Sequence, residues 1–225
     1  MTKLFFITLL LFTNSLTAGT TRLKSTAGVG VGSILLDEAT FLNPASSAFF
    51  NIGALYYQKT RTESVQGDAI NYESNLFIAS DAKGKLAGSI SYQTNSEFED
   101  GKNISVSLSS IVGDRSATGV TYHYEDGGEK SKYVTMGVTH AVNDIFTMGF
   151  VLRDPLRSKQ NNSHVIVGLQ YTYKEFITLN GDFGTDWKDR FDEKLQYGGS
   201  VQFKVFDDFY IRAGQKIDRQ QSLKT

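Results

Sequence analysis

Short polar turns recur along this chain at intervals of 30 to 33 residues. They are Lys83-Gly84, Gly113-Asp114, Asn143-Asp144, Lys174-Glu175 and Asp207-Asp208. Each turn leads into a run of alternating apolar and polar side chains, then a longer charged loop, then a second alternating run. Because strand side chains point to opposite faces with period two, the pattern predicts an all-β chain of antiparallel hairpins. Short turns at one end and long polar loops at the other are typical of an up-and-down transmembrane β-barrel of the bacterial outer membrane.

The two faces of the predicted strands differ in polarity. Ile104, Val106 and Leu108, for example, alternate with serines at 105, 107 and 109, whereas the run from Tyr72 to Ser80 is ambiguous. A soluble lipocalin-like barrel would place the apolar face inward, and a membrane barrel would place it outward. We favour outward, since the strands have about the 9–11 residues of a tilted span. An arginine at Val106 should then disrupt membrane insertion, while one at Ser107 should be tolerated.

Aromatic residues gather at both ends of the apolar face, as expected for rings that settle at the membrane–water boundary. Near the short turns these are Phe146, Tyr173, Phe176, Phe206 and Phe209; near the long loops they are Tyr92, Tyr122, Tyr124, Tyr133, Phe183 and Tyr197. The acidic stretch from Asp182 to Glu193 is expected to lie in one of those long loops.

Residues 1–18 have the pattern of a secretory signal peptide, with Lys3 before the apolar run Leu4 to Phe12 and a small residue at Ala18. A membrane anchor helix is the alternative, but it needs about 20 apolar residues. The expected location is the cell outer membrane. We divide the chain into the signal peptide (1–18), an N-terminal plug segment (19–48) and an outer-membrane β-barrel (49–225).

Composition excludes several other classes of protein. The chain has no cysteine, which rules out a lipid-anchored lipoprotein, a disulfide framework and a thiolate metal site. A formal net charge of −1 without a basic stripe argues against nucleic acid as a partner. Neither a GxSxG elbow nor an HExxH motif is present, and His123, His140 and His164 lack metal-ligand spacing. We therefore expect no enzyme, no cofactor and no metal.

The strand count poses a problem of closure. We expect a first strand near residues 49–60 and ten more that end near Ile217, which makes about 11 strands. Single-chain bacterial barrels have an even number, and an open edge in lipid leaves backbone groups unpaired. The expectation is a C-terminally shortened barrel whose reading frame continues beyond Thr225. A smaller variant barrel is the alternative.

Residues 19–48 do not alternate. They contain AGVGVGSILLDEATFLNPASSAF, in which Ser33 to Phe41 is compatible with a short helix. Their notable residues are the spaced glycines Gly28, Gly30 and Gly32, the acidic pair Asp37-Glu38, and Asn43, Pro44 and Ala45 ahead of the first strand. This order resembles the FadL-type outer-membrane superfamily, which includes long-chain fatty-acid and hydrocarbon channels and the PorV-type barrels of type IX secretion. The resemblance implies a 14-stranded barrel with an N-terminal lumenal plug, and, in the transporters, apolar substrates that leave sideways through a break in the wall.

Each plug residue has an expected role. The spacing of the three glycines does not match a phosphate-binding loop, so we expect them to pack tightly against the barrel wall. Asp37 and Glu38 are expected on a solvated helix face or as lumenal charges. Asn43 should cap or buttress the plug, and Pro44 should fix the chain direction into the first strand.

Three functions are compatible with these patterns. The first is FadL-like transport of small hydrophobic molecules, for which glycines within strands (Gly88, Gly137, Gly149, Gly168 and Gly199) would permit a kink in the wall. The second is a PorV-type secretion or assembly scaffold, and the third is a general diffusion pore. The expected partners are outer-membrane lipids and the barrel assembly machinery, with a hydrophobic small-molecule ligand or an envelope complex according to the function.

Overall fold

The computed structural model describes residues 20–63, 71–95, 101–127, 130–158, 163–186, 195–207 and 209–218, so the predicted signal peptide lies outside the described residues. Its sheet is all antiparallel, and each strand pairs with the next in sequence order. The strands are β1 (Gly53–Glu63), β2 (Asn71–Asp81), β3 (Leu86–Asn95), β4 (Gly101–Ile111), β5 (Ser116–Asp126), β6 (Ser131–Ala141), β7 (Phe146–Arg153), β8 (His164–Tyr173), β9 (Ile177–Thr185), β10 (Gln196–Phe206) and β11 (Phe209–Asp218). The predicted up-and-down barrel fold and its 11 strands are confirmed.

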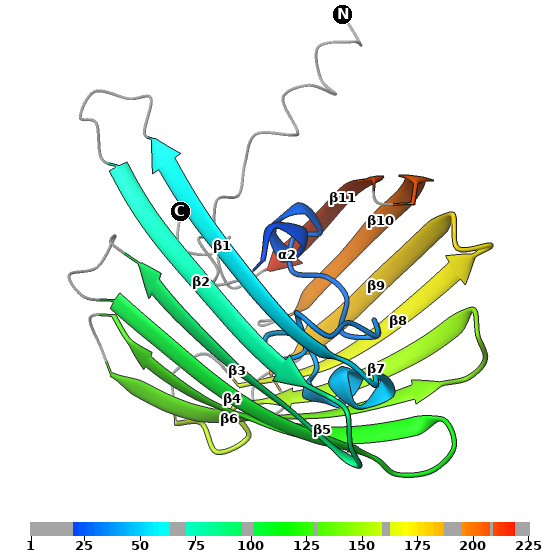
Figure 1. Cartoon of the computed structure of the whole chain (residues 1–225), viewed down its shortest axis with the longest axis horizontal. Coiled ribbons are helices and arrows are strands. Elements are labelled where there is room, and N and C mark those ends of the chain that lie inside the picture. Colours follow the sequence, from blue (N-terminus) through cyan, green and yellow to red (C-terminus); the bar gives the residue numbers. More distant parts are fainter. Residues whose placement is uncertain are drawn as a thin grey trace, which may run out of the picture.

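The sheet curls into a deep trough. Figure 1 shows β1 and β11 at its two edges and the N-terminal segment in the hollow between them. Within the described residues β1 pairs only with β2, and β11 only with β10. The first strand starts at Gly53, later than expected, because residues 44–49 form a short 3-10 helix, η1 (Pro44–Phe49). Pro44 suits the first position of that helix, where its missing N–H is not needed.

The apolar face of the sheet points outward, as expected for a membrane barrel. Val106 and Leu108 are 41% and 47% exposed, whereas the alternating serines of β4 are buried toward the hollow. On the ambiguous strand β2, Phe77 points outward, while Leu76 and Ile78 point inward and are fully buried. The structure argues against tolerance of arginine at Ser107, because this side chain is 1% exposed and its hydroxyl lies 2.6 Å from that of Ser89.

The aromatic girdles are largely as predicted. Large rings are exposed near the long loops, as at Tyr92 and Tyr122, and near the short turns, as at Phe176 and Phe209. Tyr133 is an exception, since it faces inward and is 3% exposed. Within the described residues, no helix is long and apolar enough to cross a membrane.

The N-terminal segment crosses the hollow as one short helix, a series of turns, and η1. Helix α2 (Thr21–Ser25) is capped by the Thr20 side chain, which accepts a hydrogen bond from the Leu23 N–H. The run from Ser33 to Phe41, which is compatible with a short helix, forms isolated turns. A helix of that length is marginal by itself. Here Ser33 binds Asn180 of β9, while Glu38 binds Thr20, and the turns let the chain reach both partners.

Candidate functional site

A track of glycines on the inner face of the sheet lets the N-terminal segment lie directly on the barrel wall. A Cβ atom added at any of these glycines would overlap the segment's atoms. The glycines and what they contact are Gly119 on Pro44, Gly137 on Asn43, Gly149 on Val31, Gly168 on Gly32, Gly198 on Val29 and Gly214 on Thr26. They lie on β5, β6, β7, β8, β10 and β11 in turn. The strand glycines 137, 149 and 168, which we expected to permit a wall kink, allow this close approach.

Asn43 fastens the segment to β6. Its side-chain amide donates to the carbonyl of Val31 at 3.0 Å, to the carbonyl of Val138 at 3.1 Å and to the Thr139 hydroxyl at 3.0 Å. Its Oδ1 atom accepts from the Ala45 N–H at 3.1 Å, which caps the start of η1. Pro44 and Ala45 are buried beside it. One residue therefore joins two parts of the plug segment to the wall.

Asp182 fastens the segment to β9. Its carboxylate accepts from the Gly30 N–H at 2.7 Å and from the Val31 N–H at 3.1 Å. Gly28 and Gly30 have φ angles of 73° and 140°, which L side chains rarely adopt, so the turn that aims these amides requires glycine. Sequence reasoning placed Asp182 in a long loop. Asp182 and Asn180 are two residues apart, as are residues on the same face of a strand, and this spacing could have placed Asp182 on the inner face of a strand.

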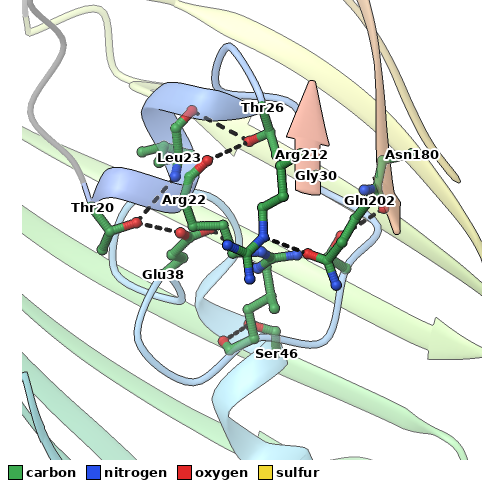
Figure 2. Close-up of polar contacts among 12 residues, drawn as sticks. Thr20, Arg22, Leu23, Thr26, Gly30, Glu38, Ser46, Asn180, Gln202 and Arg212 are labelled. Carbon is green, nitrogen blue, oxygen red and sulfur yellow. Dashed lines mark hydrogen bonds and ion pairs between the residues drawn. The ribbon is translucent and has the colours of Figure 1, made fainter. Parts of the chain in front are cut away.

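A second polar group lies beside α2, where this helix faces β11. Glu38 is 1% exposed, binds the Thr20 hydroxyl, and forms an ion pair with Arg22 at 3.4 Å. Burial raises the pKa of the Glu38 carboxyl, an effect that the nearby Arg22 guanidinium opposes. Figure 2 shows Arg22 and Arg212 of β11 approaching each other beside Glu38, with Arg212 donating to Gln202 at 2.7 Å. Asp37, next in sequence, is only half-buried.

A small cavity remains between the plug segment and strands β6 to β11. Its volume is about 50 Å³, which is room for a few water-sized groups. One part of its lining is apolar and the other is charged. The apolar lining residues are Val31, Phe41, Leu42, Val151 and Ile166, and the charged ones are Arg153, Asp182 and Lys216.

A polar ladder runs along the inner wall toward this cavity. The His123 ring stacks on Tyr133 with centroids 4.4 Å apart, and its two nitrogens contact the hydroxyls of Ser105 and Thr135. The Tyr133 hydroxyl donates to Glu125 at 2.8 Å and accepts from Arg153 at 3.2 Å. The ladder thereby fixes the guanidinium of Arg153 at the cavity wall.

The remaining predicted residues lie apart from this cavity. His140 is on the outer face, where it contacts Ser116 at 2.9 Å, and His164 is buried on the inner face of β8. Gly88 and Gly199 are not part of the glycine track, since a Cβ at either would meet only ordinary contacts. Among the described residues, no three His, Asp or Glu side chains come together as metal ligands.

Comparison with known proteins gives the fold but no family. No protein-family model matches the chain, and no curated protein matches it. A solved structure titled "Asymmetric conductivity of engineered proteins" is similar over 93% of this chain and 66% of its own, with a TM-score of 0.50 and 12% identity. The KdgM porin gives a TM-score of 0.49 at 10% identity over 75% of this chain and 92% of its own.

A triple mutant of the Rh. blastica porin gives a TM-score of 0.48 at 13% identity over 65% of this chain. The chain spans 51% of the length of that porin. The similarity at a TM-score of 0.50 agrees with the β-barrel fold. The resemblance to the FadL-type superfamily stays a prediction.

Proposed function

We propose that this protein is an outer-membrane channel for small solutes, with a lumen narrowed by its own N-terminal segment. The observation that carries the proposal is the polarity of the wall: apolar side chains face outward, and serine and threonine side chains face the hollow. Such a wall presents an apolar surface to lipid and offers water and polar solutes an interior path. The solved structure that is similar over 93% of this chain belongs to work on the asymmetric conductivity of engineered proteins, and we extend conductivity to this chain.

The plug segment makes the proposed channel narrow. It is held by hydrogen bonds to β9 through Asp182, to β6 through Asn43, and to β7 through Thr147, whose hydroxyl donates to the Gly32 carbonyl at 2.6 Å. At the other edge the Thr21 N–H donates to Gln58 of β1 at 2.7 Å. Because these contacts come from widely separated strands, the segment is a fixed constriction, and we expect small conductance.

FadL-like transport of small hydrophobic molecules is the second candidate. The apolar side of the cavity, with Phe41, Leu42 and Ile166, favours it. The cavity volume of about 50 Å³ opposes it, since pockets for drug-sized ligands have about 300–1,000 Å³. A PorV-type scaffold would need a docking surface in the long loops, which lie largely outside the described residues.

Planar-bilayer recording of the purified full chain tests the channel. We expect small, discrete conductance steps from the wild-type protein. The double variant Asn43→Ala/Asp182→Ala loses the contacts of the plug to β6 and β9, and we expect larger steps from it. A matched control is Gly199→Ala/Gly181→Ala, which changes two strand residues that do not touch the plug.

Absence of conductance from both the wild-type and the loosened variant, in protein that is folded and inserted, would contradict the channel. Equal conductance from the loosened variant and the control would contradict the plug as its constriction.

A further inference from the structure

The cavity beside the plug segment has more positive than negative charge. Arg153 and Lys216 line it as cations, and Asp182 lines it as the one carboxylate among the described residues. Both oxygens of Asp182 already accept hydrogen bonds from the plug amides of Gly30 and Val31. Because these two amide hydrogen bonds already stabilise the negative charge of the carboxylate, Asp182 compensates the charges of the two cations only weakly.

Lys216 is the cation of the cavity that has no hydrogen-bond or ion-pair partner among the described residues. Its side chain is half-buried on the inner face of β11, within electrostatic reach of Arg153, Asp182 and Asp218. Within the described part of the chain, its ammonium forms neither a hydrogen bond nor an ion pair. A half-buried ammonium without a partner has an energetic cost, which an anion in the cavity would offset.

Arg153 faces the same cavity with a fixed orientation. Its guanidinium lies over the ring of Tyr133, 5.6 Å from the centroid, and donates to the Tyr133 hydroxyl at 3.2 Å. Tyr133 in turn donates to Glu125 and stacks on His123. A guanidinium held in this way is preorganised to bind an oxyanion, because little side-chain freedom is lost on binding.

We propose that the cavity binds a small oxyanion between Arg153 and Lys216. The volume of about 50 Å³ suits a phosphate, a sulfate or a short carboxylate, and excludes a lipid chain. A small oxyanion is thereby the proposed solute of the channel described above. The anion site rests on that channel only for the route by which the ion enters, since binding can be measured without conduction.

Inorganic phosphate is the probe for this site. The midpoint of thermal unfolding of the full chain, folded in detergent, is measured against phosphate concentration, with sodium chloride added to keep the ionic strength constant. We expect a saturable rise in the midpoint for the wild-type protein, because a ligand that binds only the folded state stabilises it.

Lys216→Met removes the unpaired ammonium and should abolish the phosphate effect. Without phosphate its unfolding midpoint should be no lower than that of the wild type, because a half-buried unpaired charge has been removed; a merely structural lysine would give a lower midpoint. Arg153→Lys keeps the charge but loses the planar fork, so phosphate affinity should fall about tenfold. Lys132→Met, an exposed lysine of β6, is the matched control and should retain the full phosphate effect.

A wild-type midpoint that does not respond to phosphate, or an equal response in Lys216→Met, overturns the anion site. Conductance of the same preparations separates the two proposals. A protein that conducts without binding phosphate contradicts only the anion site, whereas one that binds phosphate without conducting contradicts only the channel.

Discussion

Single glycines decide how closely the plug segment can approach the wall. At Gly137 a methyl group would fall on the side chain of Asn43, and at Gly149 it would fall on the backbone of Val31. Hydrogen bonds hold both neighbours in place, since the Asn43 amide donates to the carbonyls of Val31 and Val138. The glycine at each of these positions is therefore required by contact with the plug rather than by backbone conformation.

Gly137→Ala should lower the free energy of unfolding by ~1–3 kcal/mol, the cost of overpacking a fitted interior. Gly199→Ala should be nearly neutral, because its added methyl group would lie 3.7 Å from the Asn180 carbonyl, an ordinary contact. Urea titration of both variants in detergent gives the comparison. Equal stability of the two would show that the segment does not lie against β6.

The buried carboxylate of Glu38 should make stability depend on pH. Because burial raises its pKa in the folded state, the unfolded chain releases this proton first as pH rises above the ordinary value of 4.5. The contribution of Glu38 to the free energy of unfolding then falls with rising pH, by ~1.4 kcal/mol for each unit of pKa difference.

Glu38→Gln removes this titration, so its stability relative to the wild type should increase from pH 4 to pH 7. Unfolding curves at several pH values measure the difference. A difference that stays constant, or that changes in the opposite direction, would contradict a raised pKa for Glu38.

At the scale of strands, neighbouring residues face different environments. On β8, Leu169 is exposed on the outer face, and Gln170 is half-buried on the inner face. Leu169→Arg should prevent stable insertion, because arginine near the bilayer midplane costs about 2–4 kcal/mol. Gln170→Arg should be accepted. Flotation of proteoliposomes measures insertion, and equal insertion of the two variants would mean that the assigned faces are wrong.

The strands could be predicted from sequence because alternation is a local signal. Serines at 105, 107 and 109 against Val106 and Leu108 fixed both the strand and its two faces. Strand β2 was ambiguous because Leu76 and Ile78 are buried on its inner face, which breaks the polar pattern.

The path of the plug could not be predicted in the same way, because its partners are distant in sequence. Asn43 bonds to Thr139, Gly30 to Asp182, and Thr21 to Gln58. No local pattern joins those pairs. The spaced glycines of the segment were recognisable, but the matching glycines on the wall became meaningful only once the strands were placed side by side.

At the scale of the whole molecule, the plug segment is the element that joins distant parts of the sheet. It contacts β1 through Gln58 and β11 through Gly214, the two edge strands in Figure 1. Between them it touches β4 through Ser109 and β6 through Asn43. The proposed channel, its constriction and the proposed anion site all depend on this placement.

A designed disulfide tests the placement most directly. The hydroxyls of Ser47 in η1 and Ser109 on the inner face of β4 lie 2.7 Å apart, and the chain has no cysteine of its own. In the Ser47→Cys/Ser109→Cys variant isolated from outer membranes, we predict a disulfide in nearly every molecule, measured by thiol labelling and by mass spectrometry of linked peptides. In Ser47→Cys/Leu108→Cys, whose second cysteine is on the outer face, we predict free thiols. Free thiols in the first pair, or a disulfide in the second, would contradict a plug packed inside an outer-membrane barrel.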